Sequence, residues 1–324
     1  MTGLGQRIQR QQVPLFLAAI VLGAVGGTLA PVLAPALAVL ITPALGLLLF
    51  ATFLGVPLTR LGRAVVDLRF LGVLLLVNFV LVPAVVFGLT RFIAGDPALL
   101  FGVLLVLLTP CVDYVIVFAG LAGGARDRLL ATTPLLMLLQ ILLLPVYLRL
   151  IIGPDAVDLI EVGPFLDAFL FLIVLPLLAA AGVQAGARRR RTASLCRGTA
   201  SVMQTLMVPL MMLTLFVVIG SQIHAVGAES AALLVLIPLY LAFLVIMVGV
   251  GLLAARLGRL DVPAGRALVF SGVTRNSLVV LPLALAAPAA LHLAPLAVVT
   301  QTLVELVGMV ILVRLVPRLM PARP

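Results

Sequence analysis

The chain alternates long apolar stretches with short polar connections. About 20 consecutive apolar residues are enough for a helix to cross the hydrocarbon core of a bilayer. Ten such stretches are present, at about residues 13–30, 37–57, 70–90, 98–121, 129–150, 164–184, 202–222, 231–255, 266–287 and 295–316. The connections leave no room for a soluble domain. The pattern therefore predicts an all-α integral membrane protein with ten transmembrane helices in a single membrane domain.

Composition and charge support this class. The chain is 64% hydrophobic and only 10% charged, which excludes an ordinary soluble protein. Its net charge of +10 comes from arginines gathered in alternate connections, with the largest group at residues 188–191. This alternation follows the positive-inside rule and does not resemble a nucleic-acid-binding groove. We expect a multi-pass protein of the plasma (inner) membrane, in contact with lipid, with both termini cytoplasmic.

The chain also contains a weak internal repeat. When it is shifted against itself by 165 residues, residues 109–111 (TPC) fall on residues 274–276 (TRN), and the apolar runs that follow stay in step. The shift is close to half the chain length, so it divides the chain into two five-helix repeats, at residues 1–155 and 156–324. Because five is odd, the second repeat must enter the membrane from the opposite side, as an inverted repeat.

The fourth and ninth spans contain helix-breaking residues at corresponding places. The fourth span holds Pro110 between Thr109 and Cys111, and the ninth holds Gly272 close to Arg275. Proline removes a backbone donor and disrupts a helix. In many secondary transporters, paired broken helices of an inverted repeat form the substrate site near the bilayer midplane. The sequence therefore predicts that helices 4 and 9 are broken and cross each other.

Cys111 is the most distinctive candidate for binding chemistry. A thiolate is a soft ligand, suited to soft metals and metalloids. A buried cysteine can equally be a small packing residue. Its position directly after Pro110, two residues before Asp113, favours a functional role. On the ninth span, Thr274, Arg275, Asn276 and Ser277 offer polar groups at the corresponding break, and we expect them to contribute to substrate binding.

Ionisable residues within the membrane form the second group of candidates. Insertion of a charged side chain at a helix centre costs about 2.5–3.5 kcal/mol, so such residues are expected to be paired or functional. Arg275 would either neutralise Asp113 or leave it to bind H⁺ or Na⁺. Glu305 has apolar neighbours on both sides and is the stronger candidate for ion coupling. The repeat aligns it with Gln140, a second ion-coupling candidate or a helix–helix contact.

No enzyme motif is present. The sequence lacks a zincin motif, a nucleotide-binding loop and a nucleophile elbow in a suitable context. We expect no catalytic residues and no cofactor. An intramembrane enzyme or receptor built on Cys111 or Asp113 would need a second matched group, and it would leave the repeat unexplained.

Three motifs resemble those of the arsenite efflux permeases and their relatives, the bile acid:sodium symporters. Residues 109–118 (TPCVDYVIVF) resemble the fourth-span cysteine motif of the arsenite permeases, and residues 303–305 (LVE) resemble their tenth-span acidic motif. Residues 275–282 occupy the place of a ninth-span motif that begins with two asparagines in many members; here the first residue is Arg275. The resemblance covers all ten spans and is closest to the arsenic resistance protein branch.

The resemblance implies a secondary transporter that exports arsenite in exchange for protons. Cys111 would then contact As(III), and Glu305 would carry the proton. Thr274, Asn276 and Ser277 would hydrogen-bond the neutral As(OH)₃ molecule.

A second hypothesis assigns a different substrate and the opposite direction of transport. The chain would take up an organic anion driven by Na⁺, with Arg275 as the counter-charge of the anion. Glu305, Gln140 and Asn276 would then be Na⁺ ligands.

Overall fold

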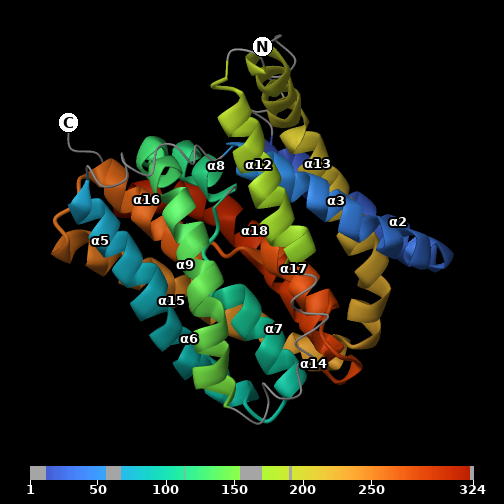
Figure 1. Cartoon of the computed structure of the whole chain (residues 1–324). Coiled ribbons are helices and arrows are strands. Elements are labelled where there is room, and N and C mark those ends of the chain that lie inside the picture. Colours follow the sequence, from blue (N-terminus) through green and yellow to red (C-terminus); the bar gives the residue numbers. More distant parts are fainter. Residues whose placement is uncertain (1–11, 56–66, 113, 154–169, 190–191, 322–324) are drawn as a thin grey trace. The chain divides into compact units, whose positions relative to one another are not determined.

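The computed structural model describes residues 12–55, 67–112, 114–153, 170–189 and 192–321 (Figure 1). This part of the chain is all-α, which confirms the predicted class. The helices group into two compact units. The first comprises Met1–Val56 and Val162–Ser230, and the second comprises Pro57–Glu161 and Ala231–Pro324. Each unit therefore takes one segment from each half of the chain.

Six helices among the described residues are long and apolar enough to cross a membrane: Pro31–Gly55, Leu68–Ile93, Leu135–Ile152, Ala193–His224, Ala231–Leu257 and Leu293–Leu319. Four further apolar helices are shorter: Pro14–Leu29, Pro97–Leu107, Leu175–Gly186 and Val262–Val273. Each of these ten helices overlaps one of the apolar stretches in the sequence. Two of the short ones, Pro97–Leu107 and Val262–Val273, are the first parts of the spans predicted to be interrupted.

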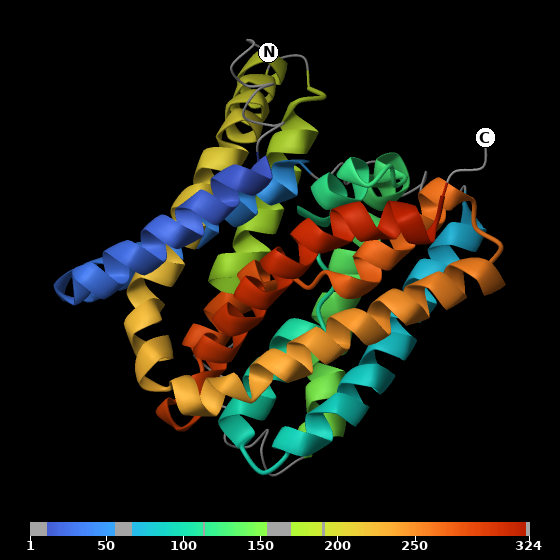
Figure 2. The same cartoon turned by 180° about the vertical axis from the view of Figure 1, so that it is seen from behind.

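The first unit is built around one long helix. It contains α2 (Gln12–Leu29), η1 (Pro31–Leu33), α3 (Ala34–Gly55), η5 (Leu170–Val174), α12 (Leu175–Gly186) and α13 (Ala193–Ala228). Helix α13 packs on both α2 and α3, and the blue helices cross the yellow α13 in Figure 2. The contact with α2 is close because glycines face each other: a Cβ atom on Gly27 would overlap the carbonyl oxygen of Gly220. Small residues allow this approach in membrane helix pairs.

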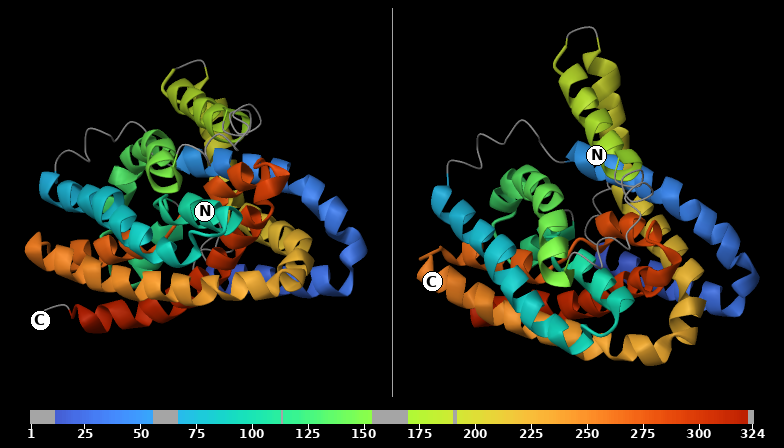
Figure 3. Two further views of the ribbon diagram at one scale, coloured as in Figure 1. Left: turned by 90° about the horizontal axis from the view of Figure 1, so that it is seen from below. Right: turned by 60° about the horizontal axis from the view of Figure 1, so that its bottom comes forward.

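The second unit holds the remaining elements: α5 (Leu68–Leu76), η3 (Val77–Leu81), α6 (Val82–Thr90), η4 (Arg91–Ile93), α7 (Pro97–Leu107), α8 (Tyr114–Leu121), α9 (Arg126–Ile152), α15 (Leu236–Leu257), α16 (Val262–Val273), α17 (Ser277–Leu285), η6 (Ala289–Leu291) and α18 (Leu293–Leu319). The short helix α14 (Ser230–Leu234) precedes α15. Helix α15 packs against α16 and α18 and runs along η3 and α6 (Figure 3). Helix α7 packs on α18, where Gly102 faces the backbone of Ala294.

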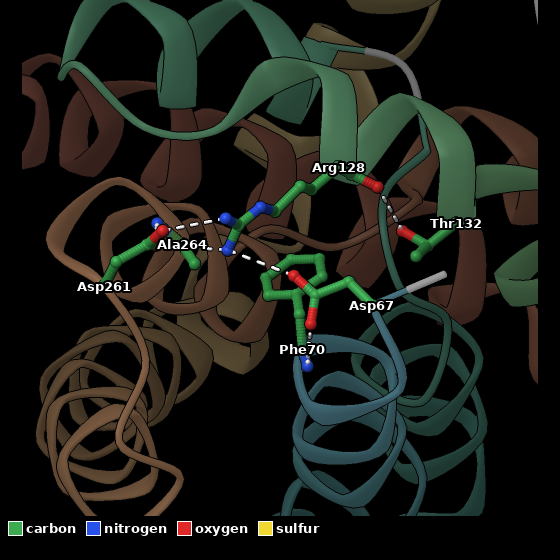
Figure 4. Close-up of polar contacts among 6 residues, drawn as sticks. All are labelled: Asp67, Phe70, Arg128, Thr132, Asp261 and Ala264. Carbon is green, nitrogen blue, oxygen red and sulfur yellow. Dashed lines mark hydrogen bonds and ion pairs between the residues drawn. The ribbon is translucent and has the colours of Figure 1, made fainter. Parts of the chain in front are cut away.

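Aspartates begin several helices of the second unit. Asp67, Asp96 and Asp261 each accept hydrogen bonds from backbone N–H groups in the first turns of α5, α7 and α16. This is the standard N-cap arrangement, which satisfies donors that have no partner within the helix. Arg128, from the first turn of α9, lies between two of these caps (Figure 4). Its guanidinium nitrogens lie 3.2 Å from Asp67 Oδ2 and 2.7 Å from Asp261 Oδ2.

A π-helical turn interrupts the stretch from α5 to α6. It covers Val77–Leu81, just before Pro83, whose missing N–H prevents regular helical bonding. The turn holds Asn78, which is fully buried. The wider turn thus brings a single amide side chain into the interior of the second unit.

Candidate functional site

Both segments that the sequence predicts to be interrupted are interrupted, and they meet. Helix α7 ends at Leu107 and α8 begins at Tyr114. Helix α16 ends at Val273 and α17 begins at Ser277. Between these ends, Pro110 and Arg275 form an isolated antiparallel β-bridge. The non-helical backbone of each segment therefore finds hydrogen-bond partners in the other, as backbone at membrane depth requires.

Two backbone hydrogen bonds flank the Pro110–Arg275 bridge. The N–H of Cys111 donates to the carbonyl oxygen of Thr274, with an N···O distance of 3.2 Å. The N–H of Asn276 donates to the carbonyl oxygen of Thr109 at 2.9 Å. Pro110 itself occupies the pair position that makes no bond to its opposite residue, so its missing N–H costs nothing here.

Arg275 is fully buried, and its guanidinium contacts the carboxyl-terminal ends of both broken helices. Nη2 donates to the carbonyl oxygens of Ser271 and Gly272, in the last turn of α16, the latter at 2.8 Å. Nη1 lies 3.4 Å from the carbonyl oxygen of Leu107, the last residue of α7. Nη2 also lies 3.0 Å from Asn78 Oδ1. The positive charge thus lies where two helix dipoles present their negative ends.

Glu305 on α18 is also buried and is held by three donors. The hydroxyl of Tyr114 lies 2.7 Å from Oε1, and the backbone N–H of Arg275 donates to Oε2 at 2.8 Å. Gln301 Nε2, one turn earlier on α18, donates to Oε2 as well. An ionised carboxylate only accepts hydrogen bonds, and each of these three groups can donate one to it.

Tyr114 links the carboxylate to the bridge. Its hydroxyl lies 2.7 Å from Glu305 Oε1 and 2.9 Å from the carbonyl oxygen of Arg275, so its single proton is shared between two acceptors. The direct contact between Arg275 and Glu305 is therefore the hydrogen bond from the backbone N–H of Arg275, and not an ion pair with its guanidinium. The cation and the anion are held by separate sets of neighbours within one polar network.

Several buried polar atoms next to this network have no hydrogen-bond partner among the described residues. They are both amide atoms of Asn276, Oγ of Ser277 and Oε1 of Gln301. Asn276 and Ser277 lie at the start of α17, directly after Arg275. Buried polar groups are nearly always hydrogen-bonded in folded proteins, and each exception calls for an explanation. A ligand that supplies the missing partners is the simplest one.

The remaining residues predicted from the sequence take no side-chain part in the described hydrogen bonds of this network. Thr274 donates its hydroxyl to the carbonyl oxygen of Phe270 at 2.6 Å, so the hydroxyl serves its own helix. Cys111 is buried within the bridge segment. Gln140, on α9, is buried with an unpartnered Oε1, and no hydrogen bond in the described part of the chain joins it to Glu305. Asp113 lies outside the described residues. No cluster of three or more metal-binding side chains occurs among the residues described.

Three members of the network were not among the sequence candidates: Asn78, Tyr114 and Gln301. Asn78 Nδ2 donates to Ser271 Oγ at 3.0 Å, a hydrogen bond between two helices of the kind that polar residues make in membrane proteins. The sequence pattern alone gives little indication that Tyr114 and Gln301 belong to the site. Gln301 lies one turn before Glu305 on the same helix, and this i, i+4 spacing is the feature that could have identified it.

The sequence model of the Sodium Bile acid symporter family matches residues 42–226, which is more than half of the chain. The chain belongs to this family. Members of the Sodium Bile acid symporter family are transporters and not enzymes. Together with the apolar helices described above, membership makes this chain a multi-pass membrane transporter. It also indicates a small-molecule substrate and coupling to Na⁺.

The match includes the first interruption, with Cys111, and ends before the second interruption and Glu305. It does not single out the arsenic resistance branch. No curated protein matches the chain.

Proposed function

We propose that the protein is a secondary transporter that uses the Na⁺ gradient to take up a small organic anion. Both solutes would bind where the two interrupted spans meet. The observation that carries the proposal is the group of buried, unpartnered polar atoms on Asn276, Ser277 and Gln301, next to the carboxylate of Glu305.

The oxygens of this group are suited to Na⁺. Oδ1 of Asn276, Oγ of Ser277 and Oε1 of Gln301 are neutral oxygen ligands, which hard cations prefer. Glu305 adds a negative charge, joined to Gln301 by a hydrogen bond. Gln140 offers another unpartnered amide oxygen on α9. Membership of a sodium symporter family supports Na⁺ as the coupling ion over H⁺.

The helix ends favour an anionic substrate. Helices α8 and α17 both begin at the meeting point, and the amino-terminal ends of helices attract negative groups. Nδ2 of Asn276, unpartnered at the start of α17, would donate to a substrate oxygen. We further propose that Asp113, the residue before Tyr114 in the sequence, contributes to ion coupling.

Alternating access would follow from two inverted five-helix repeats, residues 1–155 and 156–324. The bridge supports this symmetry. Pro110 and Arg275 are the residues that the 165-residue shift superimposes. Exchanging the two segments converts the bond from Cys111 to Thr274 into the bond from Asn276 to Thr109. The division into two units, each drawn from both halves, supports rocking of one unit against the other.

We also propose a plasma (inner) membrane location, and the arginine-rich connections support an orientation with both termini cytoplasmic. These connections alternate with arginine-poor ones along the whole chain.

Export of As(III) in exchange for protons is the second candidate. The observation in its favour is Cys111, which lies buried in the bridge segment next to Asn276's backbone contact with Thr109. Its thiolate would contact the metalloid, and Glu305 would carry the proton. The family match favours Na⁺ and an organic substrate over this reading.

The test is flux into and out of vesicles that contain the purified protein. Labelled carboxylates, arsenite and antimonite would be compared with and without gradients of Na⁺ and of pH. The proposal predicts accumulation of a carboxylate that needs inward Na⁺. Arsenite export that follows the pH gradient and is lost in Cys111→Ser would establish the second candidate instead.

A further inference from the structure

The guanidinium of Arg275 occupies a ring of oxygen atoms. Three are main-chain carbonyl oxygens, from Leu107 at the end of α7 and from Ser271 and Gly272 at the end of α16. The fourth is Oδ1 of Asn78, on the π-helical turn. Water has no access, because Arg275 and Asn78 are both fully buried. The ring of Phe243 lies on another side, with its centroid 5.6 Å from Cζ.

A ring of this kind is what a bound cation requires. Carboxyl-terminal ends of broken helices and unwound carbonyl groups coordinate Na⁺ or H⁺ in secondary transporters. Two negative helix ends and a side-chain amide oxygen converge here, and no carboxylate of the described residues is among the ligands. The oxygens would repel one another if no positive charge lay between them.

We propose that Arg275 is a tethered cation: its guanidinium permanently fills an oxygen-lined site that would otherwise take a monovalent cation from solution. The charge is supplied by the chain and therefore cannot dissociate during a transport cycle. Removal of the side chain should convert the protein into one whose folded state depends on an added cation.

Two other roles for Arg275 fit the contacts less well. A simple ion pair with Glu305 would place the guanidinium on the carboxylate, whereas Glu305 is contacted by the backbone N–H of Arg275. A counter-charge for substrate would need guanidinium N–H groups that point away from the chain. Nη2 contacts oxygens of Ser271, Gly272 and Asn78, and Nη1 contacts that of Leu107. The charged group is thus directed at the chain, and the N–H groups left without a described partner, those of Nε and one of Nη1, belong to a fully buried side chain.

One consequence for coupling rests on the proposed function. Suppose that Asn276, Ser277 and Gln301 bind the transported Na⁺. The wild type then carries no second Na⁺, because the guanidinium of Arg275 occupies the other cation site. Transport by an Arg275→Ala variant would then need one more Na⁺ per cycle than transport by the wild type.

The direct test is thermal unfolding of the purified full-length protein in detergent, which does not depend on transport. Arg275→Ala should unfold at a lower temperature than the wild type. Ethylguanidinium should restore the lost stability in a saturable way, and Na⁺ should stabilise the variant by more than it stabilises the wild type. Tetramethylammonium at the same ionic strength should do neither. The wild type should show no saturable response to ethylguanidinium, because its own guanidinium fills the ring. Its response to Na⁺ should report the proposed transport site alone.

Arg266→Ala provides a matched control. The Arg266 guanidinium also donates to carbonyl oxygens, those of Ala122 and Met320, but it is only partly buried, so water can replace it. This variant should respond to the two cations as the wild type does. If Arg275→Ala is as stable as the wild type, or if no cation stabilises it selectively, the proposal is wrong.

Loss of the folded protein in Arg275→Ala would still be informative. Arg275→Lys keeps the charge, and Arg275→Met keeps most of the volume. The proposal predicts that Lys yields more folded protein than Met. Equal yields, or a higher yield with Met, would overturn it, because volume and not charge would then matter. Failure of the carboxylate flux experiment would leave these results unaffected.

Discussion

Pro110 and Arg275 lie opposite each other in an antiparallel bridge between two broken helices, 165 positions apart in the chain. Proline suits this position, because the two hydrogen bonds of the bridge are made by the neighbouring residues. The opposite residue is an arginine whose side chain turns to the helix ends. One pair of residues thus holds the crossing together and places a positive charge in it.

A disulfide between these positions would test the crossing. In an antiparallel pair of this type the Cα atoms are about 4.5 Å apart, within the range of about 4.4–6.8 Å that disulfides span. We expect Pro110→Cys combined with Arg275→Cys to form a disulfide under mild oxidation, in a protein whose Cys111 and Cys196 are replaced by alanine. Mobility on non-reducing gels after cleavage between the two positions would show it.

The control pairs Pro110→Cys with a cysteine at Leu285, the last residue of α17. At a rise of about 1.5 Å per residue this end lies roughly 12 Å beyond the start of the helix, so no disulfide is expected. Cross-linking of the control pair and not of the 110–275 pair would contradict the described geometry.

Tyr114→Phe should lower the apparent affinity of transport for Na⁺ without unfolding the protein. It removes the hydroxyl that lies against Glu305 Oε1 and the carbonyl oxygen of Arg275. A hydrogen bond to a charged group contributes about 1.5–3 kcal/mol. We therefore expect the Na⁺ concentration for half-maximal transport to rise at least about tenfold.

Tyr240→Phe is the matched control. Its hydroxyl donates to the carbonyl oxygen of Ala297 at 3.0 Å, between α15 and α18, with no contact to the carboxylate. This change should lower stability by about 1 kcal/mol and leave the Na⁺ dependence unchanged. Equal effects of the two substitutions on Na⁺ dependence would remove Tyr114 from the ion site.

Gly102→Ala should prevent α7 from packing on α18. An added Cβ atom would lie 2.6 Å from the carbonyl oxygen of Ala294 and 2.7 Å from its Cα atom, and a helix backbone cannot yield as a side chain can. We expect a marked loss of folded protein, measured by monodispersity in gel filtration. Gly88→Ala on α6, where a Cβ atom would meet nothing within 4 Å, should be tolerated. A fully folded Gly102→Ala variant would refute the close packing.

Arg128 should contribute little to stability, although it joins three helix starts. The side chains of Arg128, Asp67 and Asp261 are 37%, 40% and 52% exposed. Exposed ion pairs contribute about 0–1 kcal/mol and are screened by salt. We expect a small, salt-sensitive decrease in the unfolding temperature for Arg128→Ala. Asp261→Ala should cost about 0.5–2 kcal/mol more, because it also removes an N-cap. A large, salt-insensitive effect of Arg128→Ala would show that the cluster has another role.

The apolar pattern was sufficient to predict an all-α membrane protein, because helix length in a bilayer follows directly from run length. The breaks were also predictable, since Pro110 and the residue that the repeat aligns with it, Arg275, mark corresponding places in two spans. Proline alone would not suffice, because Pro43 and Pro209 lie inside continuous helices. The grouping of helices into units could not be predicted, because it depends on contacts between distant segments. Helix α13 packs on α2 and α3 across more than a hundred residues.

Only part of the candidate site could be predicted, because some of its contacts also join residues that are far apart in the chain. Thr274, Arg275, Asn276, Ser277, Cys111 and Glu305 were selected as polar residues in apolar surroundings, and the structure brings the neighbourhoods of both breaks together. Tyr114 was passed over because its acceptor lies 191 residues away in the chain. The direction of the Arg275 side chain, toward helix ends and not toward a carboxylate, follows from three-dimensional packing that no single segment encodes.

Direct measurement of Na⁺ binding tests the central claim most simply. Radioactive Na⁺ would be titrated onto purified wild-type protein, onto Asn276→Ala and Gln301→Leu, and onto Thr302→Val, whose hydroxyl bonds only within its own helix. We predict saturable binding to the wild type and Thr302→Val, and at least about tenfold weaker binding to the other two, since each lost ligand contributes more than about 1.4 kcal/mol. Unchanged Na⁺ affinity in Asn276→Ala and Gln301→Leu would contradict the proposed site.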